Sequence, residues 1–554
     1  MTNTSTGIME SLFIIVVTFC ISFFLILLFN LFFQKTKKLP PGPFIFPVIG
    51  MLPLLRKTSR DLELMLRDLK RKYGPIIAIK IGYSSPSIVI SSHLLAYQAL
   101  VQQGAICSDR PIASTTSKIF NSNQRTIASS SYGPTWRLLR RNLISEMLHP
   151  SRIIKSHSKN RAWVLGILIQ KLLLAHESAA ADYATEAIML LDHFKYAIFC
   201  LLVLICFGNK LDEFQIEQIK DAQHRALKNF HRFRILDYFP EFLGKTIFRK
   251  RWKELIELRK ELDGVFIPLI QDRVKYKLEA VGAPKPGVDH HHKEEEELEA
   301  DIAYVDTLVN LELPEEKRKL NYQEMASLCG EFLAAASDTT YTALQWIMAC
   351  LVKYPSIQEK LYKEICQVVE STPLLQSIKN NKVIEEAVKE EDLQKMPYLK
   401  AVILEGLRRH PPTHFVLPHR VTEDMELNGY VIPKNATINF MVGEMGLDPN
   451  VWDDPMEFKP ERFLVDGDGT LQEFDITGSR EIKMMPFGAG RRICPGYGSA
   501  MLHLQYFVAN LIWQFEWKPV EGDEVDLTEG SDFTVTMKNP LRARISPRCC
   551  TGSL

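Results

Sequence analysis

The chain has 554 residues, of which 46% are hydrophobic and 24% are charged, and its formal net charge is +1. This composition is that of an ordinary globular protein, and the balanced charge argues against a nucleic-acid partner. No Gly/Ser-rich linker or internal repeat divides the chain. We therefore expect one large folded unit.

A nearly unbroken apolar run extends from Leu12 to Phe33, interrupted only by small polar residues. About 20 such residues span a bilayer. Basic residues follow the run and only Glu10 precedes it, so the positive-inside rule places the body in the cytosol. A cleaved signal peptide is the alternative, but the run is longer than an h-region and lacks a basic n-region. Residues 1–34 are therefore predicted to be a signal anchor with one transmembrane helix.

Residues 35–45 contain Leu39-Pro40-Pro41-Gly42-Pro43, whose prolines cannot continue a helix and form a stiff hinge. The predicted folded domain then covers residues 46–548, and residues 549–554 are a polar tail. In a reducing cytosol the ten cysteines are expected to be core residues rather than disulfides. No C-x-x-C pair indicates a zinc or iron-sulfur site.

Secondary-structure patterns predict a mainly α chain with small β-sheets. Alternating hydrophobicity predicts strands at Ile76–Ile81 and Ser87–Ile90, and a long helical pattern runs from Tyr322 to about Tyr354. A further strand is expected at Thr413–Pro418. The stretch 277–299 mixes Gly, Pro, Glu and a histidine triplet, which indicates a solvated surface loop with at most adventitious metal binding.

One cysteine lies among closely spaced glycines and prolines, in the stretch Pro-Phe-Gly-Ala-Gly-Arg-Arg-Ile-Cys-Pro-Gly-Tyr-Gly at 486–498. A cysteine that ligates iron as a thiolate needs a nearby cation, backbone N–H donors and shelter from water. The glycines allow close approach to a flat ligand, and Pro495 can open a helix. Cys494 is therefore a candidate metal ligand. A buried cysteine in a Gly-rich loop is the alternative.

Phe487, Gly490, Arg492, Cys494 and Gly496 fit the pattern F-x-x-G-x-R-x-C-x-G without a mismatch. This stretch resembles the haem-binding loop of the cytochrome P450 superfamily. The resemblance implies haem b with the Cys494 thiolate as the axial ligand of iron. It also implies the cytochrome P450 fold, with haem between this loop and the long helix, preceded by one transmembrane helix.

Four more positions match those at which this family contacts the haem propionates: Arg110, Trp136, Arg140 and His419. Trp136 and Arg140 are four residues apart and share a helix face. Alone, they would indicate a surface cation-π pair. His419 as a second axial ligand is the competing interpretation, but it would block oxygen.

The segment Ala335-Ala336-Ser337-Asp338-Thr339-Thr340 places an acid and an alcohol in the middle of an apolar helix. Both are costly there unless the helix opens locally or they take part in chemistry. The segment looks like the family's oxygen-activating helix, which implies that Thr339 and Asp338 are catalytic and hold the proton-supplying water. Ala336 stands where glycine is commonest, so less opening is expected.

Glu405 and Arg408 are three residues apart on a predicted helix and can pair, although E-x-x-R alone is usually a solvated ion pair. The segment Phe458–Phe463 resembles the family's P-E-R-F stretch, so Arg462 is expected to close a buried Glu-Arg-Arg network behind the haem. The implied substrate pocket is lined by Leu333, Ala335, Phe415, Val416 and Phe533.

The resemblance as a whole is to plant microsomal (A-type) haem-thiolate monooxygenases of the endoplasmic reticulum membrane. It implies insertion of one atom of O2 into a lipophilic small-molecule plant metabolite, with electrons from an NADPH-dependent cytochrome P450 reductase. The chain is similar to a plant branch that includes oxidisers of linear tetrapyrrole catabolites of chlorophyll. A haem-thiolate lyase or isomerase, acting without O2 or reductase, and a non-catalytic haem-binding protein are the alternatives.

Overall fold

The structure is a computed structural model that describes most of the chain. Described are Ile14, Val17, Thr18, Ile21 and Ser22, and residues 38–45, 59–81, 85–181, 187–238, 241–282, 302–370, 388–465, 469–530 and 532–548. Apart from those five isolated positions, the predicted membrane helix lies outside the described residues, as do residues 283–299 of the predicted surface loop and the polar tail. None of the helices in the described segments combines the length and the hydropathy that a membrane span requires.

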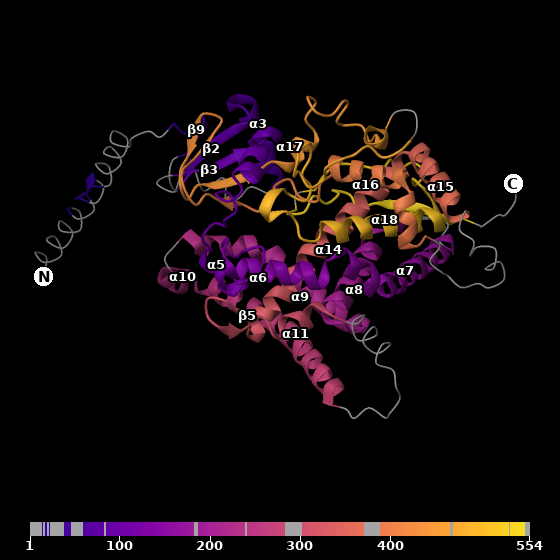
Figure 1. Cartoon of the computed structure of the whole chain (residues 1–554), viewed down its shortest axis with the longest axis horizontal. Coiled ribbons are helices and arrows are strands. Elements are labelled where there is room, and N and C mark those ends of the chain that lie inside the picture. Colours follow the sequence, from indigo (N-terminus) through magenta and orange to yellow (C-terminus); the bar gives the residue numbers. More distant parts are fainter. Residues whose placement is uncertain are drawn as a thin grey trace, which may run out of the picture.

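The described chain is mainly helical with small sheets, which confirms the predicted fold class (Figure 1). The α-helices are α3 (Ser59–Tyr73), α4 (His93–Tyr97), α5 (Thr115–Phe120), α6 (Pro134–Asn142), α7 (Pro150–Ala181), α8 (Leu191–Phe207), α9 (Glu213–Phe233), α10 (Glu241–Ile247), α11 (Arg249–Gly282), α13 (Tyr304–Leu308), α14 (Tyr322–Lys353), α15 (Pro355–Glu370), α16 (Pro397–Arg409), α17 (Val442–Gly446) and α18 (Tyr497–Gln514). The strands are β1 (Phe44–Ile45), β2 (Ile76–Ile81), β3 (Ser87–Ile90), β4 (Ile188–Met189), β5 (Glu312–Leu313), β6 (Arg318–Lys319), β7 (His419–Arg420), β8 (Met425–Leu427), β9 (Tyr430–Ile432), β10 (Thr437–Phe440), β11 (Phe515–Lys518) and β12 (Arg542–Pro547).

The largest described sheet lies at one end of the molecule, beside α3 (Figure 1). Its strand order is β1-β2-β3-β10-β7, in which β2 and β3 are antiparallel and β10 runs parallel to β3. Alternate residues of β3 are buried on opposite faces: Ile88 and Ile90 join one apolar cluster, and Val89 joins another with Leu66 of α3. The two strands predicted from the sequence are confirmed with the same bounds.

The strand expected at Thr413–Pro418 is wrong. Only an isolated bridge forms there, between Phe415 and Met441, and the regular pairing begins at β7. Pro418, the last residue of the segment, offers no backbone N–H to a ladder.

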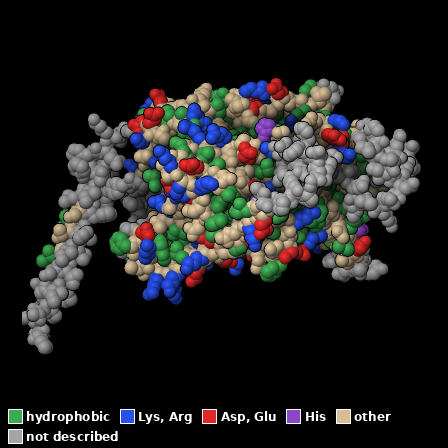
Figure 2. All heavy atoms as spheres, turned by 60° about the horizontal axis from the view of Figure 1, so that its bottom comes forward, with side chains coloured by type: hydrophobic (Ala, Val, Ile, Leu, Met, Phe, Trp, Pro, Cys, Tyr) green, Lys and Arg blue, Asp and Glu red, His purple; other side chains and the backbone are tan. Residues whose placement is uncertain are grey.

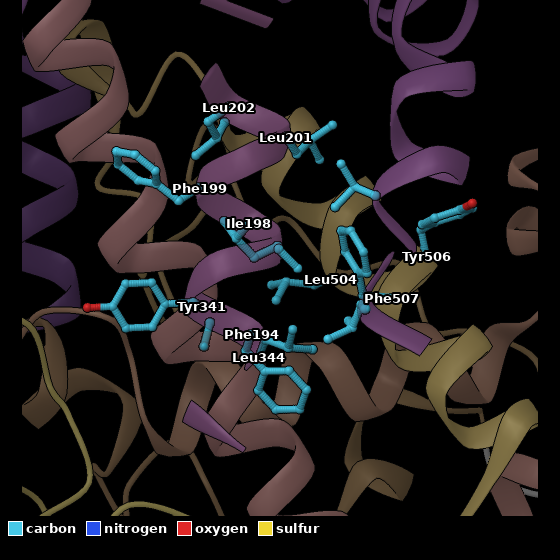
Figure 3. Close-up of a cluster of buried hydrophobic side chains, with 14 of the residues drawn as sticks. Phe194, Ile198, Phe199, Leu201, Leu202, Tyr341, Leu344, Leu504, Tyr506 and Phe507 are labelled. Atoms are coloured by element: carbon cyan, nitrogen blue, oxygen red, sulfur yellow. The ribbon is translucent and has the colours of Figure 1, made fainter. Parts of the chain in front are cut away.

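Helix α14 lies at the centre of the helical part and packs against α8, α11, α16 and α18. Figure 3 shows side chains of α8, α14 and α18 meeting in the main apolar core, among them Phe194, Leu344 and Phe507. Because α8 is apolar on nearly all sides, it is buried over most of its length. The long helix predicted from Tyr322 is confirmed.

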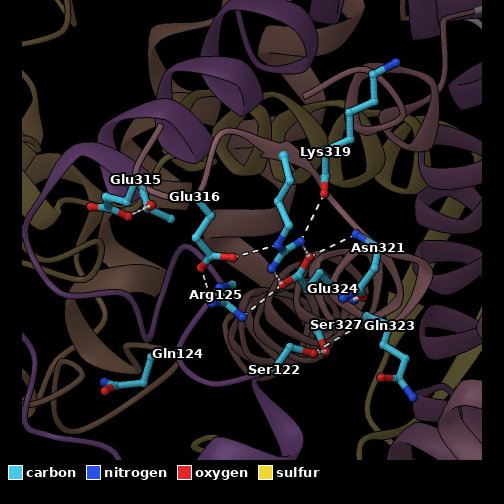
Figure 4. Close-up of polar contacts among 12 residues, drawn as sticks. Ser122, Gln124, Arg125, Glu315, Glu316, Lys319, Asn321, Gln323, Glu324 and Ser327 are labelled. Carbon is cyan, nitrogen blue, oxygen red and sulfur yellow. Dashed lines mark hydrogen bonds and ion pairs between the residues drawn. The ribbon is translucent and has the colours of Figure 1, made fainter. Parts of the chain in front are cut away.

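The start of α14 is fixed by a capping box and two arginines (Figure 4). The Asn321 side chain accepts from the Glu324 backbone N–H at 2.9 Å, and the Glu324 carboxylate accepts from the Asn321 N–H at 2.9 Å. Arg125 and Arg318 also donate to this carboxylate, at 3.0 and 2.7 Å. The helix therefore begins at a defined residue, which sets the position of everything along it.

The face of the molecule shown in Figure 2 carries interspersed basic and acidic side chains. This mixture agrees with the net charge of +1. The cysteines of the described segments are free thiols, and most of them are buried.

Candidate active site

The cysteine loop is closed by its own backbone. The Cys494 N–H donates to the Phe487 carbonyl at 2.8 Å, and Gly488 and Gly490 both have φ of 69°. A Cβ at Gly490 would lie 2.1 Å from the Leu100 carbonyl oxygen. Only glycine fits this position, because both its φ and its contact exclude a side chain. The loop ends at Gly496, the N-cap of α18.

Opposing influences act on the charge of the Cys494 sulfur. Burial raises the pKa of the thiol, whereas a hydrogen bond from the Gly496 N–H and the nearby Arg140 charge lower it. The protein thus provides two of the groups that favour a thiolate. A metal cation bound at the sulfur would complete the deprotonation.

Three arginines, Arg110, Arg140 and Arg492, lie close to the loop from three different parts of the chain. Their hydrogen bonds go to backbone carbonyl oxygens, and in the described part of the chain none of them forms an ion pair with a carboxylate. The acceptors are Ala128, Leu417 and Pro418 for Arg110, Ile493 for Arg140, and Ser108, Ile127 and Ser130 for Arg492.

Burial is the main cause that lowers the pKa of these arginines, to about 10 for Arg110 and about 9 for Arg492, and their mutual repulsion lowers it further. Concentrated positive charge of this kind favours an anion. The site therefore suits a ligand that carries carboxylates.

Trp136 of α6 lies against two of these arginines. The guanidinium carbon of Arg140 is 5.5 Å from its ring centroid and that of Arg492 is 4.5 Å away. The buried indole Nε1 has no hydrogen-bond partner among the described residues. A buried donor without an acceptor is costly, so this N–H is a second indication of an acceptor ligand beside the arginines.

His419 is buried at the start of β7, with its Nδ1 2.7 Å from the Cys107 carbonyl oxygen. The Nδ1 atom carries the proton, since a carbonyl can only accept. Burial, followed by repulsion from Arg110, lowers the pKa of His419 to about 3. The ring is thus neutral, and its Nε2 would need a second proton to face a carboxylate.

Asp338 and Thr339 lie on an unbroken part of α14. The Thr339 hydroxyl donates to the Ala335 carbonyl of the same helix at 2.7 Å. Burial raises the pKa of Asp338, and Lys195 and Tyr341 partly offset this. Within the described chain, no hydrogen bond joins Asp338 to Thr339: the acid faces α8, and the alcohol is bound to its own helix.

Glu405 and Arg408 are both fully buried and form a two-pronged ion pair at 2.6 and 2.8 Å. Arg462 donates to the same Glu405 carboxylate at 3.1 Å, as does the Lys459 backbone N–H at 2.8 Å. Arg408 also donates to the Gly446 carbonyl of α17 at 2.6 Å. The structure therefore brings together all three residues of the network expected from the sequence.

The residues expected to line a pocket do not all point the same way. Val416 lies beside the cysteine loop, 3.6 Å from where a Cβ on Gly488 would be, whereas Phe415 packs into the cluster between the sheet and α3. Leu333 is fully buried in the main core and Ala335, two residues further along α14, is exposed. Phe533 is 70% exposed.

Comparison with known proteins identifies the family: a cytochrome P450 family model matches residues 40–545. This chain belongs to the cytochrome P450 family. It is 48% identical to cytochrome P450 89A9 of Arabidopsis thaliana, over 97% of this chain and 98% of that protein. It is 26% identical to a flavonoid 3',5'-hydroxylase of Solanum melongena, over 93% of this chain and 92% of the other.

The fold is similar to that of a solved structure of a zebra fish cytochrome P450 with abiraterone. The TM-score is 0.63 at 20% sequence identity, and the match covers 88% of this chain and all of the other. The mainly helical architecture with small sheets is thus the cytochrome P450 fold.

Cytochromes P450 are monooxygenases that hold haem through a cysteine thiolate and receive electrons from NADPH through a reductase. The residues of this site fit that cofactor. Cys494 offers the thiolate in a loop that glycines keep open to a flat ligand, and the arginines with the orphaned Trp136 N–H suit the two haem carboxylates.

Two acidic residues that support the site were not predicted. Asp109 accepts from the backbone N–H groups of Arg110 and Tyr132, both at 2.9 Å. Glu331 of α14 accepts from the N–H groups of Ile127 and Ala128, both at 2.8 Å. The sequence signal for Glu331 is an acid within an apolar helical run, the same signal that indicated Asp338.

A hollow of about 440 Å³ lies elsewhere, between α5, α10, α11 and the start of α14. Glu324 lines it and precedes Thr339 by 15 residues, which is about 22 Å along a helix. None of the residues that line the hollow belongs to the cysteine loop. Its lining is Thr115, Lys118, Ile119, Ser122, Asn123, Arg125, Glu241, Trp252, Ile256, Arg259, Asp263, Asn321, Gln323 and Glu324.

Proposed function

We propose that this P450 inserts one atom of O2 into a lipophilic small-molecule plant metabolite, with Cys494 as the iron ligand. The observation that carries the proposal is the Cys494 loop itself, with its bonded backbone and the arginines beside it. Its relatives support the substrate class, since one that is 26% identical is named a flavonoid hydroxylase.

Each site residue has a proposed task. Arg110, Arg140, Arg492 and Trp136 bind the carboxylates of haem, and the Gly496 N–H stabilises the sulfur charge. Bound in this way, haem supplies the activation of O2. Glu405 and its arginines hold the chain in shape behind the loop and do not touch the reactants.

We assign the supply of protons for O2 activation to residues of α14. Burial raises the pKa of Asp338 toward neutral pH, so this carboxyl is better suited to give and take a proton. We assign it the uptake of protons from the side of α8, where Lys195 lies. The Thr339 hydroxyl then has to leave the Ala335 carbonyl to orient a water toward the haem, and Ala336 makes this opening less easy than glycine would.

Replacing Thr339 tests the proton task. Thr339→Ala is expected to keep NADPH consumption while a larger share of the electrons ends in hydrogen peroxide, because the ordered water loses its partner. Thr339→Ser keeps the hydroxyl and is the matched control. Equal peroxide yields from the wild-type protein and the alanine variant would contradict the assignment.

Replacing Cys494 tests the ligand. Reduced, carbon-monoxide-treated protein is expected to show the absorbance maximum of thiolate-ligated haem, and Cys494→His is expected to lose it. Cys366→Ser removes a thiol elsewhere and is expected to leave the spectrum unchanged. A maximum typical of histidine ligation in the unaltered protein would overturn the proposed function.

We further propose that residues 12–33 anchor the enzyme in the endoplasmic reticulum membrane with the catalytic domain in the cytosol, and that a reductase in the same membrane is its partner. The apolar run at 12–33 and the lysines that follow it support this proposal. Deletion of residues 1–34 is expected to release the protein from the microsomal pellet, and unchanged pelleting in high salt would argue against the anchor.

The substrate is testable by Soret spin-state shifts with a panel of lipophilic plant metabolites that includes a linear tetrapyrrole. Product formation that requires O2, NADPH and reductase is expected. Turnover of hydroperoxides without O2 or reductase would instead identify a lyase or isomerase on the same fold.

A further inference from the structure

A cluster of three ligand-type side chains lies outside the active site, where α3 approaches α17 (Figure 1). Glu63 comes from α3, His414 from the segment after α16, and Glu529 from the segment between β11 and β12. One donor atom from each lies within 4.8 Å of the others. The His414 Nε2 is 3.2 Å from Glu63 Oε2 and 3.1 Å from Glu529 Oε2.

These separations suit a small divalent transition metal. Zinc bonds of roughly 2.0–2.2 Å to nitrogen and oxygen in a tetrahedron place the donor atoms about 3.3 Å apart. Imidazole with carboxylates is a common zinc ligand set, with a water in the fourth position. His414 and Glu529 are 12% and 18% exposed, which leaves a route for that water.

Each carboxylate is also oriented from behind. Arg67 donates to Glu63 Oε1 at 2.6 Å, and the His410 Nδ1–H donates to Glu529 Oε1 at 3.1 Å, so both Oε2 atoms are left facing His414. The His410 side chain is itself fully buried, which fixes the direction of this hydrogen bond. Metal-binding carboxylates are commonly held in this way by donors behind them.

Basic side chains surround the carboxylates of the cluster. Arg67 and Lys70 both contact Glu444 of α17, at 2.6 and 2.9 Å. Together these two bases neutralise two of the three carboxylates, Glu63, Glu444 and Glu529. Arg409 also interacts electrostatically with Glu529. A metal cation at the His414 Nε2 would lie between Glu63 and Glu529, the two carboxylates that contact this atom.

We propose that Glu63, His414 and Glu529 bind a divalent transition metal, for which Zn²⁺ is the best match, and that this metal joins α3 to the segments after α16 and β11. The same segments are already in contact, since the Val535 N–H donates to the Pro412 carbonyl at 2.9 Å. A proton on His414 is the competing occupant, and zinc binding displaces it.

The test uses the full-length, haem-loaded protein with His290, His291 and His292 replaced by serine, because adventitious metal binding by that triplet would obscure the result. The protein is incubated with zinc sulfate and passed through a desalting column, and zinc is measured per haem by mass spectrometry. One zinc per haem is expected. His414→Gln and Glu63→Gln are each expected to lose it.

His93→Gln is the matched control, because His93 lies 3.6 Å from one carboxylate, Asp448, and belongs to no three-ligand cluster in the described chain. It is expected to retain the zinc. An unchanged Soret band shows that each variant is folded. Zinc that persists in both His414→Gln and Glu63→Gln, or is absent from the triplet-free parent, overturns the proposal.

Thermal unfolding gives a second readout. Zinc at about 100 times its dissociation constant is expected to raise the unfolding midpoint of the triplet-free parent by roughly 3 °C, and to leave that of His414→Gln unchanged. A parent whose midpoint does not respond to zinc would also overturn the proposal.

Discussion

The Glu405 network and the Glu63 cluster both join distant segments through carboxylates, but with different bases. Glu405 is held by Arg408 and Arg462, which stay charged at any pH in use and leave no room for another cation. The Glu63 cluster relies on His414, whose ring can give up its proton, and is partly open to solvent. The first network is therefore a fixed link, and the second can exchange its occupant.

The largest effect is expected from breaking the fixed link. Glu405→Gln leaves the fully buried Arg408 without its counter-charge, so the free energy of unfolding should fall by roughly 3–5 kcal/mol. Denaturant unfolding of the haem-loaded protein measures it. Glu461→Gln, which removes an exposed pair with Lys360 in the same region, is expected to cost less than about 1 kcal/mol. Equal losses of unfolding free energy in the two variants would show that burial does not determine how much an ion pair contributes to stability.

Two glycines of α17 leave space for residues of the two links. A Cβ on Gly446 would lie 2.4 Å from the Arg408 carbonyl oxygen, and one on Gly443 would lie 2.6 Å from the His414 Nδ1. Backbone cannot yield, so Gly446→Ala is expected to lower the free energy of unfolding by about 1–3 kcal/mol. Gly443→Ala is expected to cost less, since a ring can rotate, but to lower the zinc content. The reverse order of stability would contradict this.

The two links are also expected to respond differently to acid. The pKa of the buried His410 is lowered to about 4, so between pH 6.5 and 4 the unfolded chain binds a proton that the folded chain does not. The free energy of unfolding therefore decreases as the pH is lowered through this window, by about 1.4 kcal/mol per pH unit for this group. His410→Gln keeps a donor for Glu529 without titrating, and its stability should fall less steeply on acidification. An unchanged slope would contradict the origin in His410.

The smallest effect is expected from Lys70→Met. Lys70 is 28% exposed, and Arg67 still neutralises Glu444 after the change. The free energy of unfolding should fall by no more than about 1 kcal/mol, and the loss should shrink as salt rises. A loss that does not respond to salt would indicate packing rather than charge.

The sequence predicted the cysteine loop and the Glu405–Arg408 pair because their residues are close along the chain. It did not indicate the Glu63 cluster, whose members come from three distant segments, and only tertiary packing brings them together. The prediction of a strand at Thr413–Pro418 was wrong, since only the bridge between Phe415 and Met441 forms there. Periodicity also could not show that Thr339 donates to its own helix, since that depends on a side-chain rotamer.

Helix α17 is only five residues long, yet it takes part in both links. Its Gly446 carbonyl accepts from Arg408, and its Glu444 binds Arg67 and Lys70 of α3. The two attachment points, Glu444 and Gly446, are only two residues apart, which is less than one helical turn. Insertions or deletions between 441 and 447 would put one attachment out of register, so natural length variation in this protein is expected to avoid that stretch.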